Sequence, residues 1–165
     1  MDDAQALLEA GADKVAVNSA AVATPDLIDE LARAFGCQCV TLAIDATMRD
    51  GSWRVFVRSG TAPTKLLATA WAEEAADRGA GEVLLTSIDR DGTLSGYDID
   101  LIAEVTSRVR VPVVASGGAR TGGDMVAALN AGASAVLAAS IFHDRSTTVG
   151  EIKATLRAAG LEVRA

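Results

Sequence analysis

The chain has 165 residues, of which 50% are hydrophobic and 22% charged, enough for one globular domain with a sizeable core. Its 15 basic and 22 acidic side chains give a net charge of -7, which disfavours binding to a nucleic-acid backbone. No apolar run reaches the roughly 18 residues of a membrane span, and the first ten residues lack the basic region of a signal peptide, so we expect a cytoplasmic protein without membrane contact.

The metal-ligating residue types are few. Cys37 and Cys39 flank one residue, and His143 is the only histidine, so no second Cys/His pair completes a metal site. A disulfide between residues two apart is strained, so we expect two reduced thiols. The sequence predicts no metal and no cofactor, and we interpret His143 as a surface or capping residue.

Amphipathic helices alternate with short apolar strands along the whole chain. In chain order the predicted elements are a helix at 3–10, a strand at 14–19, a helix from Pro25 to Gly36, a strand at 40–45, a helix around 64–78, a strand at 82–88, a helix from about Asp98, a strand at 111–116, a helix at 121–131, a strand at 135–140 and a helix at 148–159. Thr24 has the residue type of an N-cap for the second helix. The Asp-Gly pair in R-D-G-S-W (49–53) predicts a hairpin.

The five strands are separated by helices, and they are too apolar for a sheet with one solvent-exposed face. This pattern predicts a parallel sheet covered by helices. The chain also repeats itself, because A-G-A-D-K-V-A-V-N-S (10–19) aligns with A-G-A-S-A-V-L-A-A-S (131–140). This repeat favours a (βα) barrel over a doubly wound sheet, unless Gly-Ala is only a common helix-to-strand junction. No linker divides the chain, so we treat 1–165 as a single domain.

In parallel βα proteins the functional site lies at the carboxyl ends of the strands. The residues at these ends are small, polar and rich in glycine: Asn18, Ser19, Asp45, Thr86, Ser87, Ser116, Gly117, Gly118, Ala139 and Ser140. Gly117 and Gly118 let a ligand approach backbone N–H groups, so this set fits a phosphate, although a tight structural turn is the alternative. The repeat of a terminal serine at Ser19 and Ser140 suggests two anion sites.

Three carboxylates follow two of these strands. Asp45 closes an apolar strand, either as a capping residue or as a general acid/base in a partly dry site. Asp89 and Asp91 lie in D-R-D-G-T, where an Asx turn and a functional role are both open.

Several motifs together resemble one family over essentially the whole chain. They are A-D-K-V-A-V-N-S-A-A-V, C-V-T-L-A-I-D-A, G-A-G-E-V-L-L-T-S-I-D-R-D-G-T-L-S-G-Y-D, V-P-V-V-A-S-G-G-A and A-V-L-A-A-S-I-F-H. The chain resembles the cyclase subunit of imidazole glycerol phosphate synthase, of histidine biosynthesis. The phosphoribosylformimino isomerase of the same pathway shares D-G-T-L-S-G and A-S-G-G, and is the second candidate.

The resemblance implies a (βα)₈ barrel that takes ammonia from a glutaminase partner. It cleaves and cyclises a phosphoribulosyl-formimino aminoimidazole carboxamide ribotide to imidazole glycerol phosphate. By resemblance Asp45 and Asp91 are catalytic, and Lys14 and Glu82 belong to an ammonia gate at the opposite barrel mouth. The substrate and phosphate ligands implied in the same way are Asn18, Ser19, Thr86, Gly92, Ser116, Gly117, Gly118, Ala139 and Ser140.

The chain begins in what resembles the third barrel helix of this family. We therefore expect an α/β fold that is a partial (βα)₈ TIM-type barrel, with strands four to eight and their helices. One of the family's two acid/base carboxylates has no counterpart, so we expect weak or no cyclase activity from this chain alone, and weakened glutaminase docking. A non-catalytic phosphate-binding barrel fragment is the alternative from another class.

Five strands also leave two sheet edges, at 14–19 and 135–140. Both are short, apolar and nearly uncharged, and such edges pair readily with another chain. The sequence therefore predicts a homo-oligomer, most simply a two-fold dimer.

Overall fold

The computed structural model describes residues 1–164, and helices and strands alternate along them. The helices are α1 (Asp2–Glu9), α2 (Ser19–Ala23), α3 (Asp26–Phe35), the 3-10 helix η1 (Cys37–Cys39), α4 (Ala68–Asp77), α5 (Ile99–Thr106), α6 (Gly122–Asn130), α7 (Ser140–His143) and α8 (Val149–Ala158). The strands are β1 (Val15–Val17), β2 (Val40–Arg49), β3 (Ser52–Val57), β4 (Ala62–Leu67), β5 (Glu82–Ser87), β6 (Val113–Ser116) and β7 (Ala135–Val136).

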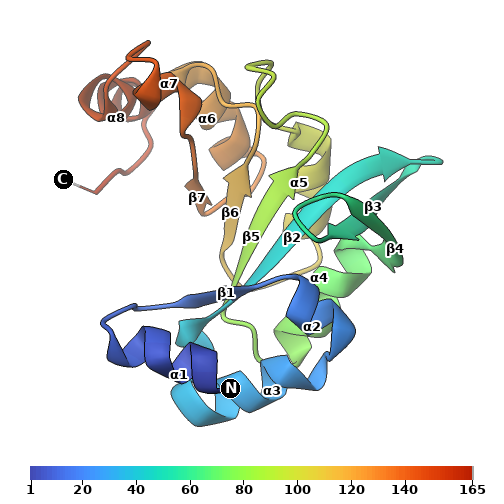
Figure 1. The fold of residues 1–165 in the computed structure, drawn as a ribbon. Helices are drawn as coiled ribbons and strands as arrows, with labels where there is room; N and C mark the ends of the chain where they lie inside the picture. Colours follow the sequence, from blue (N-terminus) through green and yellow to red (C-terminus); the bar gives the residue numbers. More distant parts are fainter. Residues whose placement is uncertain (165) are drawn as a thin grey trace.

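The five strands predicted from the sequence form one parallel sheet. The neighbours are β1 and β2, β2 and β5, β5 and β6, and β6 and β7. Helices follow the strands as they do in (βα) barrels, but the sheet is open between β1 and β7 (Figure 1). The predicted α/β fold with a parallel sheet of barrel type is confirmed.

The predicted hairpin is also confirmed. β2 continues past its parallel partners, turns at Asp50 and Gly51 with positive φ at both residues, and returns as the antiparallel strand β3. The end of β2 and β3 project together beyond the parallel strands in Figure 1, and β4 adds a third strand at the edge of β3.

Strand alternation decides which sheet face is buried. Val83, Leu85, Val113 and Ala115 point to the helices and are buried, because successive side chains of a strand alternate between its faces. The helices contribute the other half of this core from their apolar stripes: Ile28 and Leu31 of α3, Trp71, Ala72 and Ala75 of α4, Leu101, Ile102 and Val105 of α5, and Met125 and Ala128 of α6.

The opposite face of the sheet is only half-buried. Ala43, Leu84 and Val114 lie in its middle, on neighbouring strands in direct register. Asp45, Thr86 and Ser116 occupy the next outward-facing positions toward the carboxyl ends, so this face carries an apolar belt below a polar rim. No helix among residues 1–164 is long and apolar enough to cross a membrane.

The helix predicted around 64–78 is wrong in its first turn. Residues 62–67 form β4, and the helix α4 begins only at Ala68. A-P-T-K-L-L has the alternating burial of an edge strand, and β3 provides it with a pairing partner that local helix preference does not overcome. Pro63 is tolerated because it lies on the sheet's edge.

Three smaller expectations also need correction. Thr24 does not cap α3 with its side chain; it ends α2, and Pro25 holds the N-cap position. The strands predicted at 14–19 and 135–140 shorten to three and two residues, and Ser19 and Ser140 instead begin the helices α2 and α7. Conversely, β2 extends to Arg49 because β3 pairs with its second half.

Candidate functional site

Three polar side chains lie side by side near the end of the parallel pairing of neighbouring strands. Asp45 of β2 is in register with Thr86 of β5, and Thr86 is in register with Ser116 of β6. All three point to the half-buried face of the sheet. The register of three parallel strands thus produces a polar row that the strand-end rule predicted.

Asp45 is held in a partly desolvated environment. Asn18, which follows β1, donates a hydrogen bond from Nδ2 to Oδ2 of Asp45 at 2.9 Å. Burial raises the pKa of Asp45, the Asn18 bond opposes this shift, and the negative charge of Asp91 adds to it. The net result is a carboxyl group whose pKa lies above its ordinary value, which suits a group that both gives and takes protons.

Asp45 and Asp91 line one open cleft of about 440 Å³ with Thr86. The other lining residues are Ser59, Gly60 and Ile88. Ser59 and Gly60 come from the turn between β3 and β4, where Arg58, Ser59 and Gly60 all have positive φ. Sequence reasoning missed these two residues, because nothing local indicates that the β3–β4 turn lies next to Asp45.

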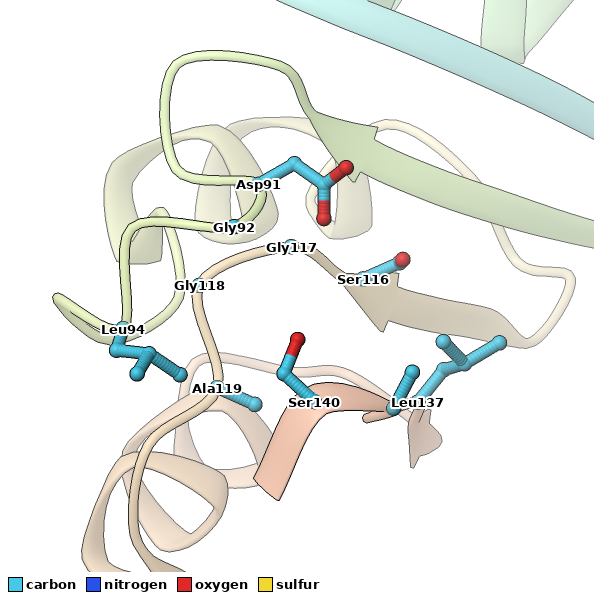
Figure 2. A pocket seen from close by; sticks show the side chains of 10 residues that line it. Asp91, Gly92, Leu94, Ser116, Gly117, Gly118, Ala119, Leu137 and Ser140 are labelled. Carbon is cyan, nitrogen blue, oxygen red and sulfur yellow. The ribbon is translucent and has the colours of Figure 1, made fainter. Parts of the chain in front are cut away.

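A second, smaller cavity lies next to the cleft and shares Asp91 with it. Its volume is about 60 Å³, room for several waters or one tetrahedral oxyanion. Six predicted phosphate ligands meet here: Gly92, Ser116, Gly117, Gly118, Ala139 and Ser140. Leu94, Ala119 and Leu137 complete the lining. We call this cavity the anion cradle (Figure 2).

Glycine is required at two positions of the anion cradle. Gly117 and Gly118 have φ of 94° and 90°, a conformation that other residues rarely adopt. A Cβ at Gly117 would lie 2.7 Å from the Ser87 carbonyl oxygen, and one at Gly118 would collide with the Gly96 carbonyl. The glycines therefore bring backbone from two loops into direct contact.

The anion cradle offers hydrogen-bond donors without a cationic side chain. Within residues 1–164 the backbone N–H groups of Gly118, Ala139 and Ser140 donate to no other residue. The Ser140 hydroxyl points toward the Gly117–Gly118 backbone (Figure 2). Free N–H groups around a cavity of this size favour an anionic ligand.

The other predicted phosphate ligands, Asn18 and Ser19, lie outside the anion cradle. Asn18 contacts Asp45, and its Oδ1 is buried without a hydrogen-bond partner in the part of the chain described. The Ser19 hydroxyl accepts a hydrogen bond from the backbone N–H of Arg58 at 2.9 Å. Both residues thus contact the hairpin side of the cleft.

Lys14 and Glu82 lie at the opposite end of the sheet from Asp45. Lys14 Nζ is 2.6 Å from Glu82 Oε2, and Thr41 donates to the other oxygen of the same carboxylate at 3.2 Å. The two residues that the resemblance assigns to an ammonia gate are therefore in direct contact, although they are 68 positions apart in the chain.

Asp89 has a role in the fold rather than in the cleft. Its carboxylate accepts hydrogen bonds from the Thr47 hydroxyl and from the Met48 N–H at 2.7 Å, so it ties the β5–α5 loop to β2. His143 is exposed in the last turn of α7. Cys37 and Cys39 are free thiols, and no group of three potential metal ligands occurs within residues 1–164.

A parallel α/β sheet with polar side chains and a glycine-lined cavity at the carboxyl ends of its strands is the arrangement of TIM-type (βα) barrel proteins. Residues 1–148 match the family model described as histidine biosynthesis protein, and the chain belongs to that family.

The chain is also similar to three proteins named imidazole glycerol phosphate synthase subunit HisF. It is 52% identical over 164 residues to the one from Gluconacetobacter diazotrophicus, covering 99% of this chain and 64% of that relative. It is 54% identical over 165 residues to the one from Myxococcus xanthus, covering 99% and 65%. It is 48% identical over 171 residues to the one from Mycobacteroides abscessus, covering 99% and 66%. The chain thus spans just under two thirds of the length of these relatives.

Proposed function

We propose that this chain carries the cyclase chemistry of imidazole glycerol phosphate synthase in histidine biosynthesis, with Asp45 as its acid/base group. The observation that carries the proposal is the adjacency of two sites. The cleft around Asp45 and the anion cradle share Asp91, so one phosphorylated ligand can occupy both.

The chemistry needs a group that moves protons while ammonia adds and a C–N bond breaks. The raised pKa of Asp45 brings the protonated and ionised forms closer in population near neutral pH, which is the condition for general acid/base catalysis. Asn18 orients the carboxyl group, and the Thr86 hydroxyl is next to it in the polar row. Asp91 is exposed at the rim, where its carboxylate can accept a hydrogen bond from a hydroxyl of the ligand.

The anion cradle supplies binding energy away from the reacting atoms. A phosphate group bound there fixes one end of the substrate, so that the rest extends into the cleft toward Asp45. The proposed ligands of this phosphate are the six cradle residues, and Asn18 and Ser19 are the proposed contacts for the other end of the substrate.

We further propose that turnover by this chain alone is weak. The cleft is open, and the half-buried sheet face beside it admits water, which reduces electrostatic stabilisation at the reacting centre. The test is steady-state conversion of the ribotide with ammonium ions by the wild-type chain and by Asp45→Asn. We expect slow turnover that falls at least 100-fold in the variant. Equal rates for the two proteins would remove Asp45 from the mechanism.

A non-catalytic phosphate-binding domain is the second candidate, and the small volume of the anion cradle, about 60 Å³, favours it. In that case phosphate and the ribotide bind with similar affinity, and neither wild type nor variant turns the ribotide over. Turnover of the isomerase's own substrate would instead support the sister isomerase.

The resemblance also makes a glutaminase subunit the proposed protein partner, with the Lys14–Glu82 pair in an ammonia gate at its docking end. Calorimetry with the glutaminase subunit of a HisF-type synthase tests this, and the absence of binding would contradict it. A cytoplasmic location belongs to the same proposal, and the free thiols Cys37 and Cys39 fit it.

Self-association is the remaining part of the proposal. In the described chain β1 pairs only with β2, and β7 pairs only with β6, so both ends of the sheet have a free edge. The half-buried belt of Ala43, Leu84 and Val114 is continuous with these edges. A second copy that covers both features makes a homo-oligomer. Light scattering at micromolar concentration tests it, and a stable monomer of 16.9 kDa would contradict it.

A further inference from the structure

Tyr97 does not line the anion cradle, but its hydroxyl contacts the segment after β7, which does. It is the only tyrosine of the chain, and 4% of its surface is exposed. Its hydroxyl donates a hydrogen bond of 2.9 Å to the backbone carbonyl of Leu137, which follows β7 and lines the anion cradle.

Two consecutive residues of the β5–α5 loop thus contact the other two segments that line the anion cradle, the one after β6 and the one after β7. The N–H of Gly96 donates to the carbonyl of Gly118 at 2.8 Å, and Tyr97 holds Leu137. The spacing between the Gly118 wall and the Ala139–Ser140 wall therefore depends on one residue pair of a third loop.

The wall that Tyr97 holds has little backbone pairing to the sheet. β7 pairs with β6 through only two residues, Ala135 and Val136. The Leu137 N–H adds one bond to Ala115 at 2.8 Å, and the chain then runs to Ser140 without pairing to the sheet. A side-chain bond to the Leu137 carbonyl at this point replaces the strand pairing that β7 lacks.

We propose that Tyr97 is a positioning residue for the phosphate group in the anion cradle, acting through the Leu137 carbonyl to fix the Ala139–Ser140 wall. This inference rests on the proposed function, because it assumes that the anion cradle binds an oxyanion. The bond also turns the Leu137 carbonyl, whose oxygen repels anions, toward the Tyr97 hydroxyl. Burial and the charge of Asp124 raise the pKa of Tyr97 well above its usual range, so the hydroxyl remains a donor.

The test compares Tyr97→Phe with Thr106→Val, using inorganic phosphate as the probe. Thr106 also bonds a backbone carbonyl, that of Ala131 at 3.1 Å, but at the end of α5 that is remote from the anion cradle. Tyr97→Phe removes the bond to Leu137, and Thr106→Val removes the bond to Ala131 together with a 3.3 Å bond to the Ala103 carbonyl, so we expect both to lower the melting temperature. Only Tyr97→Phe should weaken phosphate binding, by about tenfold, which corresponds to about 1.4 kcal/mol.

The single tyrosine gives a second measurement on the unaltered chain. With ¹³C-labelled tyrosine, the ring resonance of Tyr97 should shift during the phosphate titration and saturate with the affinity found by calorimetry. This measurement decides the matter if Tyr97→Phe does not fold. A ring signal that phosphate leaves unchanged, or equal affinities in wild type and Tyr97→Phe, would overturn the role of Tyr97 while leaving the anion cradle standing. No phosphate binding by the wild-type chain would instead remove the proposed anion cradle and this inference with it.

Discussion

The side chains of Asn18, just past β1, and Asp45, in the middle of β2, are joined by a 2.9 Å hydrogen bond. Asn18 Nδ2 is the donor, so the bond stabilises the ionised form of Asp45, while burial and Asp91 favour the protonated form. Asn18 thus limits how far the pKa of the proposed acid/base group rises.

The first prediction concerns this bond. In Asn18→Ala the pKa of Asp45 should be higher than in the wild type, because the interaction that lowers it is lost while burial and Asp91 remain. A ¹³C NMR titration of the aspartate carboxyl groups measures it. Gln38→Ala is the control, since that amide donates only to the Phe35 carbonyl on the surface. A fall in the Asp45 pKa after Asn18→Ala would refute the assignment.

The second prediction concerns stability and pH. Since the folded state raises the pKa of Asp45 above the ordinary value of 3.8, the folded chain binds that proton more tightly than the unfolded chain. Ionised Asp45 therefore destabilises the fold at neutral pH. Asp45→Asn should raise the melting temperature at pH 7, and the gain should shrink as the pH falls and vanish below about pH 3, where both states are protonated. A variant that melts lower than the wild type at pH 7 would contradict this.

The third prediction concerns helix caps. Thr148 accepts from the Glu151 N–H at 3.2 Å, and Glu151 accepts from the Thr148 N–H at 2.8 Å, which is a capping box at the start of α8. Thr148→Ala should cost about 1 kcal/mol of unfolding free energy in denaturant titrations. Thr24→Ala makes the same chemical change before α3, where the threonine side chain caps nothing, and should cost much less.

The same capping box has a pH signature. Bonds from Thr148 and Thr147 lower the pKa of Glu151, so its contribution is present above the ordinary value of 4.5 and is lost as the pH falls through the lower folded value. The cost of Glu151→Gln should therefore be present at neutral pH and decrease in acid. A cost that is independent of pH would show that Glu151 takes no part in the cap.

The fourth prediction separates backbone strain from ligand binding in the anion cradle. Gly118→Ala and Gly11→Ala both place a side chain at positive φ, 90° and 103°. A Cβ at Gly118 meets the Gly96 carbonyl, whereas nothing lies within 4 Å at Gly11. Phosphate should raise the melting temperature of wild type and Gly11→Ala but not of Gly118→Ala. The anion cradle is wrongly placed if all three respond alike.

The sequence predicted much of the fold and of the anion cradle for the same reason. Alternating helices and apolar strands imply a parallel sheet, and the carboxyl ends of its strands must meet at one edge. Hence the strand-end rule predicts five of the six cradle residues, and the family resemblance adds Gly92 from a third loop.

The remaining contacts depend on long-range geometry that no local pattern contains. The β4 strand exists because β3 offers an edge, so residues 62–67 were partly assigned to the following helix. The approach of Ser59 and Gly60 to Asp45 depends on where the β3–β4 turn lies relative to β2. The hydrogen bond from Tyr97 to Leu137 joins residues that are 40 positions apart in the chain. The predicted N-cap of α3 at Thr24 is also wrong, because α2 ends at that residue and Pro25 takes the N-cap position.

The most direct test of the account is one NMR titration with the phosphorylated ribotide. The account predicts that the backbone amides of Gly118 and Ser140 and the carboxyl carbon of Asp45 shift together and saturate at one ligand concentration, because the anion cradle and the cleft hold a single molecule. The surface groove with the cationic side chains Arg49, Arg54 and Lys65 should stay unchanged. Shifts confined to that groove, or cradle amides that move while Asp45 does not, would contradict the account.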